Sequence, residues 1–267
     1  MDSLNGFRIT NYGSGGKVRD NLSYTGNVIV GRARSGGIMR GTELFSDATI
    51  TNTHLIDNFV HVTAEDDQTL DAAPVVTQGV HDTRPDHNPT FYVGNRLVSN
   101  LANVRFGDSY GRGNRHTFID TTFVKTGDHP DYHTFVFDGG YESYDHEVID
   151  PVFEGGASVD DVWWRRTSVK SYYTIKWTVS LSGDPGASVT VEDAAGEQVY
   201  TGELDDDGRL DVPLAQITIR PAEWEEGGSG GVDQEFDHQK IAHTPHTIDV
   251  GGQTETLEVD APKSLAF

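Results

Sequence analysis

The chain has 267 residues, no cysteine, and 42 Asp and Glu against 20 Lys and Arg, which gives a formal net charge of −22. This balance excludes the basic patch that nucleic-acid binding requires and disfavours anionic membranes, while the lack of cysteine excludes disulfides and thiolate metal sites. Scattered carboxylates with few lysines are typical of a protein that stays dissolved in high salt, although cation binding and acidity without a role are alternatives.

The N-terminal residues 1–7 lack the basic start and the apolar run of a signal peptide. The sequence contains no apolar run of about 18 residues, so we expect no membrane insertion. Either the protein is soluble or part of a virion, or the chain is a fragment whose export signal lies elsewhere. Helix-type apolar spacing is nearly absent, whereas runs of Val, Ile, Thr and Phe between turn residues predict short strands near 27–30, 48–51, 59–62, 91–93 and 103–106.

A short apolar run recurs along the first part of the chain. The second apolar residues of these runs, of which the Val76 copy is the weakest, are Ile56, Val76, Val98, Ile119 and Ile149. The spacing of about 21 residues predicts a solenoid in which these side chains form one internal ladder. A second ladder would consist of Phe59, Leu101 and Phe123. Asn58 and Asn100 would occupy a bend and hydrogen-bond along the stack.

The gap between Ile119 and Ile149 is longer than the period and predicts an insertion near 128–145. This stretch combines imidazoles and carboxylates, namely His129, Asp131, His133, Asp138, Glu142, Asp145 and His146. Such groups could bind a metal or perform acid–base chemistry. The alternative is a solvated loop on an acidic protein.

The pattern changes after the adjacent Trp163 and Trp164. From about residue 172, apolar residues at 175, 177, 179 and 181 alternate with polar ones, which predicts long strands with one buried face. Turn signals follow at 193–196, 205–208 and 251–252. We therefore predict an all-β chain, with a parallel β-helix over residues 1–165 and an antiparallel β-sandwich over 172–267.

Two parts of the sequence resemble known families. Residues 118–124, Phe-Ile-Asp-Thr-Thr-Phe-Val, resemble the coils of right-handed parallel β-helix repeat proteins of haloarchaea. Residues 186–196, 207–214 and 243–248 resemble the immunoglobulin-like or carboxypeptidase-regulatory-like module that often closes such proteins. The resemblance implies an extracellular, cell-surface or virion location and a family that includes carbohydrate-active enzymes and adhesins.

The chain departs from the catalytic members of that group. Of the polygalacturonase motifs, an acidic pair alone is present, Asp160-Asp161, and it follows the last recognised coil. The calcium-binding carboxylates and basic residue of pectate-lyase-like enzymes cannot be assembled from the sequence. If the chain is an enzyme, Asp120 and Asp150 on neighbouring coils are candidates for a glycosidase pair, since coils stack about 5 Å apart. Asp138 and His133 are further catalytic candidates, and a row of turn residues is the alternative for the aligned Asp side chains.

Other residues are candidates for ligand contact. Sugar stacking is predicted for Trp163, Trp164, Tyr132 and Tyr141. Asp205 and Asp207 could hold Ca²⁺, although a tight hairpin explains them equally well. The polar loop at residues 81–89 could form a groove wall.

The predicted function is therefore non-catalytic. We expect a glycan-binding or structural role in high salt, with no cofactor unless calcium binds, and with a homotrimer or larger assembly as the form typical of spikes. A polysaccharide lyase or glycoside hydrolase is one alternative. A viral tail spike, or another structural protein of the virion, is the other.

Overall fold

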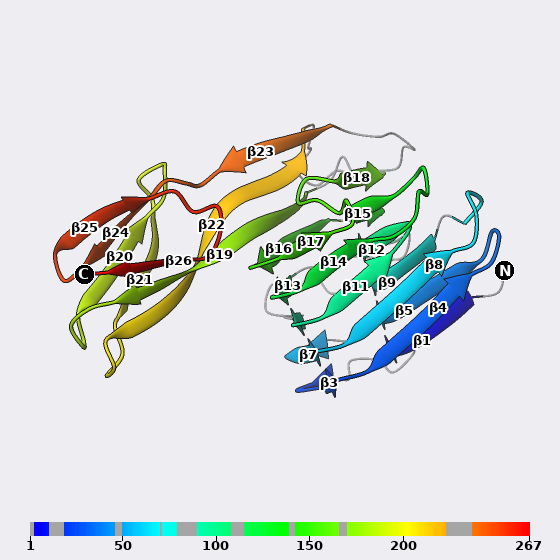
Figure 1. Ribbon diagram of the computed structural model, residues 1–267, viewed down its shortest axis with the longest axis horizontal. Coiled ribbons are helices and arrows are strands. Elements are labelled where there is room, and N and C mark those ends of the chain that lie inside the picture. Colours follow the sequence, from blue (N-terminus) through cyan, green and yellow to red (C-terminus); the bar gives the residue numbers. More distant parts are fainter. Residues whose placement is uncertain are drawn as a thin grey trace. The chain divides into compact units, whose positions relative to one another are not determined.

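The computed structural model describes residues 3–10, 19–45, 50–69, 71–78, 90–107, 115–138, 142–165, 170–222 and 237–267. Their secondary structure consists of strands, arranged in large parallel sheets and an antiparallel sheet (Figure 1). The all-β prediction is confirmed. Within these ranges, no helix has the length and hydropathy that crossing a membrane requires.

The chain forms two compact units. The first comprises residues 1–147, 151–173 and 220–239, and the second comprises 148–150, 174–219 and 240–267. Three long strands, β16 (Ser143–Ile149), β19 (Ser171–Ser182) and β22 (Arg209–Pro221), therefore contribute residues to both units. The domain limits 1–165 and 172–267 stay a prediction.

Three parallel sheets build the first unit. Sheet A has the order β1 (Ser3–Thr10), β5 (Ile38–Phe45), β9 (Asp71–Gln78), β12 (Ala102–Phe106), β15 (His133–Asp138) and β18 (Val162–Arg165). Sheet B has the order β3 (Ser23–Thr25), β7 (Thr53–Ile56), β10 (Thr90–Val93), β13 (His116–Ile119) and β16. Sheet C has the order β4 (Val28–Ala33), β8 (Phe59–Ala64), β11 (Arg96–Ser99), β14 (Thr122–Lys125) and β17 (Val152–Glu154). The short strands β2 (Arg19–Asp20) and β6 (Ile50–Thr51) pair with each other.

Consecutive strands enter the three sheets in turn, from sheet B to sheet C to sheet A, and we call each such set of three strands a repeat. The register gives the length of a repeat: Tyr24 pairs with Leu55, 31 positions on, Leu55 with Tyr92, 37 positions on, and Tyr92 with Phe118, 26 positions on. The predicted period of 21 residues is therefore wrong. The longest register distance is the 37 positions from Leu55 to Tyr92, whereas Phe123 and Phe153 on either side of the predicted insertion at 128–145 are 30 positions apart, so the repeat is not longest there.

The two predicted ladders are also wrong. Ile56 and Ile119 belong to sheet B, whereas Val76 belongs to sheet A and Val98 to sheet C. The physical reason is that each repeat contains three similar apolar runs, one for each sheet, and the sequence match joined runs from different sheets. The inward rows that the register supports are Tyr24, Leu55, Tyr92 and Phe118 in sheet B, and Ile29, Val60, Leu97, Phe123 and Phe153 in sheet C. Phe59, predicted to face inward, lies in the outward row instead.

The recurring Ile-Asp motif marks one bend of the repeat. Asp57 and Asp120, which follow sheet B strands, have φ angles of 52° and 49°, and Asp150 has 50°. Gly26 and Gly94 occupy the same place in other repeats with φ angles of 68° and 62°. Asp and Gly tolerate this left-handed conformation better than branched residues do, so the motif records a backbone requirement.

The residue after this bend points inward and forms a ladder of amides. Asn58 donates from Nδ2 to Asn95 Oδ1 at 2.9 Å and to the Tyr24 carbonyl at 3.1 Å. Its own Oδ1 accepts from both the backbone N and the Nδ2 of Asn27, each at 2.9 Å. The predicted role of Asn58 is confirmed, but its stacking partner is Asn95. Asn100 instead bonds the N–H and C=O of Ala64 at a different bend.

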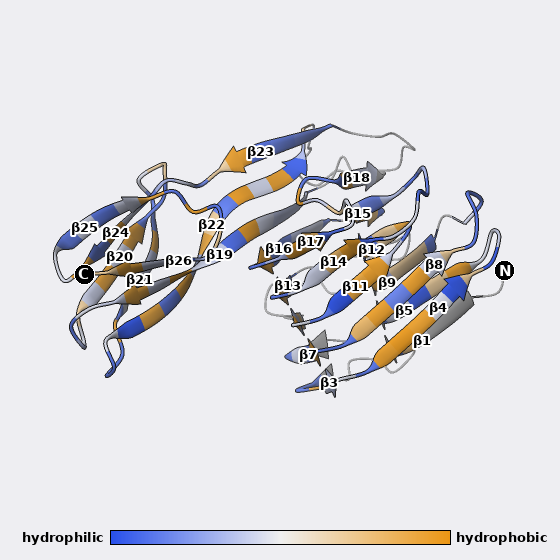
Figure 2. Cartoon of the chain, in the orientation of Figure 1, coloured by the Kyte–Doolittle hydropathy of each residue, from blue (hydrophilic) through white to orange (hydrophobic). Residues whose placement is uncertain are grey.

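The second unit contains an antiparallel sheet of the order β21 (Gln198–Glu203), β20 (Ser188–Glu192), β24 (His246–Val250) and β25 (Gln253–Leu257). The predicted hairpins around 193–196 and 251–252 connect paired strands. Also present are β23 (His238–Ala242) and β26 (Lys263–Ala266), and the latter runs parallel to β19. Hydropathy alternates along β22 (Figure 2), and inward residues of β19, β20, β22 and β24 share one hydrophobic core.

Two histidines are buried inside the first unit. The rings of His116 and His146 stack with centroids 5.4 Å apart, and both are at most 4 % exposed. His146 Nδ1 accepts from the His116 backbone N–H at 3.3 Å, so its proton lies on Nε2, which is 2.8 Å from Ser143 Oγ. Burial lowers the pKa of His116 to about 3, and burial together with the neighbouring His116 lowers the pKa of His146 well below its usual 6.5.

Replacing Asn58 by Ala should destabilise the first unit. The Tyr24 carbonyl and the Asn27 N–H would lose the Asn58 side chain as a partner, and the Asn95 amide oxygen would keep only the backbone N–H of residue 58, which together typically costs about 2–4 kcal/mol. Urea denaturation of Asn58→Ala measures this loss, with Gln68→Ala, an exposed amide of the same unit, as the control. Equal midpoints for the two variants would contradict the ladder's role.

Acid should destabilise the first unit well before most carboxylates protonate. Because the folded pKa of His116 lies below the unfolded value, the unfolded chain binds more protons between pH 6.5 and about 3. The contribution of the two neutral histidines to the free energy of unfolding is therefore fully present above pH 6.5. It is lost as the pH falls, by up to about 1.4 kcal/mol per pH unit for each histidine. Denaturation at pH 6.5 and 5 should show a smaller loss for the double variant His116→Gln/His146→Gln. Equal losses in both proteins would show that the buried pair does not control acid lability.

Candidate functional site

The outer face of sheet A carries a chain of alternating charges across five neighbouring strands. Arg8 Nε on β1 lies 2.9 Å from Glu43 Oε2, and Arg40 on the same strand as Glu43 contacts its other oxygen. Arg40 Nη2 also lies 2.7 Å from Asp71 Oδ2 on β9. Arg105 on β12 continues the series, with Nη1 2.7 Å from Asp71 Oδ1 and Nη2 against Asp138 on β15. We call this series, Arg8–Glu43–Arg40–Asp71–Arg105–Asp138, the ion-pair ladder.

Most of the ladder is shielded from solvent. The side chains of Glu43 and Asp138 are 1 % and 5 % exposed, and those of Arg40 and Arg105 are both 11 % exposed. Burial of the Asp71 carboxyl raises its pKa, but the guanidiniums of Arg105 and Arg40 more than offset this, so the net pKa lies below 3.8. Three cations face three carboxylates, so the ion-pair ladder is neutral in a chain of net charge −22. Buried charges of this kind depend on their partners, because a lone charge out of water is very unfavourable.

A small apolar cluster lies beside the ladder. Val136 pairs in register with both Arg105 and Trp163, and it packs with Ala73, Val76 and Ala102 under the Trp163 ring. Trp163 is partly buried there, and its ring stacks on His133 with centroids 5.8 Å apart. A small pocket adjoins the cluster and is lined by Leu101, Arg105, Asp131, Val136, Asp138 and Trp163.

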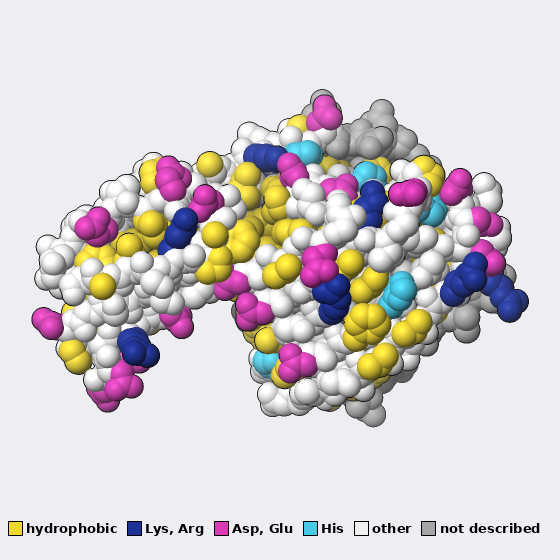
Figure 3. All heavy atoms as spheres, in the orientation of Figure 1, with side chains coloured by type: hydrophobic (Ala, Val, Ile, Leu, Met, Phe, Trp, Pro, Cys, Tyr) yellow, Lys and Arg dark blue, Asp and Glu magenta, His cyan; other side chains and the backbone are white. Residues whose placement is uncertain are grey.

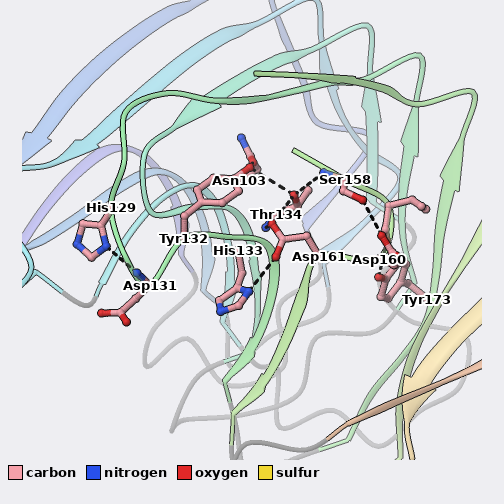
Figure 4. Close-up of polar contacts among 11 residues, drawn as sticks. Asn103, His129, Asp131, Tyr132, His133, Thr134, Ser158, Asp160, Asp161 and Tyr173 are labelled. Carbon is pink, nitrogen blue, oxygen red and sulfur yellow. Dashed lines mark hydrogen bonds and ion pairs between the residues drawn. The ribbon is translucent and has the colours of Figure 1, made fainter. Parts of the chain in front are cut away.

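The polar rim of this surface is well ordered by hydrogen bonds (Figure 4). His133 Nδ1 lies 2.9 Å from Asp161 Oδ1, and both side chains are 26 % exposed. Asp161 Oδ2 accepts from the N–H and the hydroxyl of Thr134 at 3.0 and 3.2 Å. These bonds fix the imidazole against Trp163. We call Asp131, His133, Asp161 and Trp163, with Arg105 and Asp138 beneath them, the Trp163 surface.

The structure distributes the four catalytic candidates over different places. His133 and Asp138 both belong to the Trp163 surface, although Asp138 is buried against Arg105. Asp120 is exposed at the left-handed bend after β13. Asp150 occupies the equivalent bend after β16, where it accepts from the Thr178 N–H at 2.8 Å and from the Thr178 hydroxyl. Turn geometry accounts for both of these Asp residues, as in the alternative considered for them.

Burial rules out sugar stacking for two of the aromatic candidates, Trp164 and Tyr132. Trp164 is fully buried and stacks on Phe137 at 4.4 Å, so it belongs to the core and cannot stack on a sugar. Tyr132 is 5 % exposed, its hydroxyl donates to Asn103 Oδ1 at 2.5 Å, and Lys125 Nζ lies over its ring. Trp163 faces outward, as the alternation of adjacent strand residues requires. Tyr141 and the polar loop at 81–89 lie outside the described residues.

The residues of the predicted insertion do not form one cluster. His133 begins a sheet A strand, His146 lies in the interior, and His129 is buried with Nε2 near the Asp66 carbonyl at 3.2 Å. Asp145 accepts from the Tyr172 hydroxyl. Within the described ranges, no three His, Asp or Glu side chains are arranged to hold a metal ion.

The predicted calcium ligands lie at a tight turn of the second unit. Asp205 Oδ1 accepts from the N–H groups of Asp207 and Arg209 at 2.9 and 2.8 Å, and Gly208 has a φ of 70°. A shallow pocket of about 610 Å³ adjoins this turn, and its lining, which includes Asp205, Arg209 and Asp211, has no aromatic side chain. The turn geometry is sufficient to explain the Asp-rich sequence there.

Sequence reasoning missed most of the ion-pair ladder. Arg40, Glu43, Asp71 and Arg105 lie in separate sheet A strands that no motif connects. The signal was present in weak form, as charged residues inside otherwise apolar runs such as Asn103-Val104-Arg105-Phe106. Only the correct register would have shown that these charges are neighbours.

Comparison with known proteins identifies no family for this chain. No family model matches the chain, no curated protein is detectably similar to it, and no solved structure matches it.

Arg105 should be far more important for stability than an exposed arginine on the neighbouring sheet. Arg105→Met removes the guanidinium between two shielded carboxylates, for which a loss of about 3 kcal/mol or more is expected. The matched control is Arg96→Met, which breaks an ion pair with Glu154 whose partners are 43 % and 44 % exposed, and little change is expected there. Chemical denaturation gives the free energy of unfolding of both variants. Similar decreases for the two would mean that the ladder is not a buried network.

Proposed function

We propose that this protein is a right-handed parallel β-helix, followed by an immunoglobulin-like β-sandwich, that binds neutral glycans at the Trp163 surface without cleaving them. It would act in high salt, outside the cell, on a cell surface or on a virion. The observation that carries the proposal is a single arrangement: an outward aromatic ring beside a small pocket, with ordered polar side chains at the rim.

The solenoid is supported by the course of the chain. Successive strands enter sheets B, C and A in the same order in four consecutive repeats, from β7 to β18, and the pairings β7–β10, β8–β11, β9–β12 and β15–β18 between repeats are parallel. Crossover connections between parallel strands of one sheet are nearly always right-handed. For the second unit, hairpins around one shared core support a sandwich.

The chemistry of the Trp163 surface suits a sugar. The apolar face of a pyranose stacks on an indole ring, while its hydroxyls exchange hydrogen bonds with carboxylate and imidazole groups. Asp131 is exposed at the pocket, and His133 and Asp161 are held in place by bonds that leave part of each accessible. A fixed rim lowers the entropy lost when a ligand binds.

Charge favours a neutral ligand. A net charge of −22 repels uronates and sulfated glycans at low salt, and no basic cluster appears at the Trp163 surface, where Arg105 is paired with Asp71 and Asp138. The acidic composition and the resemblance to haloarchaeal β-helix proteins support the high-salt setting.

The second candidate function is cleavage of a polysaccharide, by a glycoside hydrolase or a polysaccharide lyase reaction. The His133–Asp161 contact beside the pocket favours it. A histidine held by a carboxylate is a common acid–base device. Against this candidate, Asp138 is engaged with Arg105, and Asp120 and Asp150 lie in left-handed bends. Neither Asp120 nor Asp150 lines the pocket with Asp138, so the predicted carboxylate pair is not assembled there and binding is the better account of the described residues.

Trp163→Ala should weaken binding to a neutral glycan. A glycan array in molar NaCl identifies ligands, and calorimetry on the best hit should then show at least about tenfold weaker binding for Trp163→Ala, as loss of a stacked aromatic ring implies. The matched control is Phe59→Ala, which removes a half-buried aromatic ring from the outer face of sheet C.

The same glycans should be incubated with the protein and assayed for new reducing ends. Binding without turnover supports the proposal, whereas turnover lost in His133→Ala would replace it by the enzymatic candidate. Binding that Trp163→Ala and Phe59→Ala weaken equally would place the ligand elsewhere.

A further inference from the structure

One edge strand of the parallel sheets is unusually open. Strand β4 is the last strand of sheet C and pairs with β8 on one side. Val28 and Val30 on this strand are 73 % and 68 % exposed, which makes them the most exposed large hydrophobic side chains among the described residues. Figure 3 shows hydrophobic side chains gathered over the start of β4 and β8.

The backbone of β4 presents hydrogen-bonding groups to this open side. The Asn27 and Ala33 carbonyls accept from Phe59 and Glu65, each at 2.9 Å, so the odd-numbered residues of the strand face β8. By the alternation of a parallel ladder, the N–H and C=O groups of Val28, Val30 and Arg32 point the other way. The side chain of Ile29 points inward, where Gly6 leaves room for its Cγ2 atom.

Three other edges of the parallel sheets, at β17, β3 and β18, have features that disfavour strand addition. Strand β17, at the opposite end of sheet C, is three residues long and carries Glu154 in an ion pair with Arg96. Strand β3 is also three residues long, and β18 ends in Arg165. Strand β4 carries one charge, Arg32 near its end, in an exposed ion pair with Glu65 at 3.3 Å. In contrast to the other edges, the run Asn27-Val28-Ile29-Val30-Gly31 before it has neither a charge nor a proline, although 62 of the 267 residues are charged. An exposed apolar edge without such protection is a template for another strand.

We propose that β4 is the self-association site of this protein, where it pairs antiparallel with β4 of a second copy of the chain. A two-fold axis near Ile29 would set each Val28 opposite the second copy's Val30. Both residues direct their backbone groups outward, so each such pair would exchange two N–H···O=C bonds, as antiparallel strands require. Arg32 would lie opposite Gly26, and no like charges would face each other.

Charge selects a second copy over an acidic or basic partner strand. The uncharged run has no group to complement a charged peptide, while the symmetric pairing places apolar side chains against apolar side chains. The remainder of each chain is strongly acidic, so two copies repel each other at low salt. Salt screens this repulsion and leaves the uncharged strand pairing intact, so association should increase with salt.

Sedimentation velocity tests the proposal with the full chain, from micromolar to several hundred micromolar protein, in low and in molar NaCl. We expect a monomer–dimer equilibrium that shifts to dimer with salt. Val30→Lys introduces the charge that natural edge strands use for protection, and it should weaken dimerisation at least about tenfold. The matched control is Val152→Lys on β17, where the valine is 47 % exposed at the other edge of the same sheet, and its dimerisation should equal that of the wild type.

Hydrogen exchange gives a second measurement on the unmodified protein. The amides of Val28, Val30 and Arg32 should gain protection as protein concentration rises, while the amide of Ile29, which faces β8, should change less. The proposal is overturned by a wild type that stays monomeric in molar salt, by a Val30→Lys variant that dimerises normally, or by equal effects of Val30→Lys and Val152→Lys. Binding of an unrelated strand peptide without self-association would assign the edge to a different partner.

Discussion

Parallel register is the constraint on which the first unit depends. Each repeat places its residues over the equivalent residues of the next at the strand spacing of about 4.8 Å, so any residue at a bend is stacked on its counterparts. At the bend between sheets B and C, the backbone must adopt a left-handed conformation and the next side chain must satisfy polar groups inside. Asp57 and Asn58 meet both demands, and Gly94 and Asn95 meet them in the following repeat. The amide ladder thus fixes the register that aligns the strands of all three sheets.

The same constraint explains what the sequence could and could not reveal. Strand-forming runs, the all-β class and the alternation in β19 follow from local patterns, and the structure agrees with them. The length of the repeat could not be found from local patterns, because Ile56 and Val98 lie in similar sequences that belong to different sheets. Connections of unequal length separate the repeats, so that Leu55 and Tyr92 are 37 positions apart but Tyr92 and Phe118 only 26. A regular spacing cannot be found by comparing runs when each repeat contains three of them.

The candidate site was partly predictable for a related reason. His133, Asp138 and Trp163 were selected individually, since imidazole, carboxylate and indole groups have recognisable chemistry. Arg105 lies 33 positions before Asp138, and Asp71 lies a further 34 positions before Arg105, so the register alone makes these residues neighbours. Which of the two adjacent tryptophans is accessible could not be predicted from the sequence, because side chains alternate along a strand and either one could face the core. Phe137 covers Trp164, and the outward Trp163 keeps its place beside the pocket.

Charge is organised differently on the two outer faces of the first unit. On sheet A, buried ion pairs join five strands, and their mutual neutralisation allows carboxylates such as Asp138 to lie away from water. On sheet C, the charged residues lie in exposed pairs such as Arg96 with Glu154, and the edge strand β4 carries valines instead. The Trp163 surface carries three carboxylates and one arginine and suits small neutral ligands with an apolar face, whereas the uncharged run of β4 suits backbone pairing.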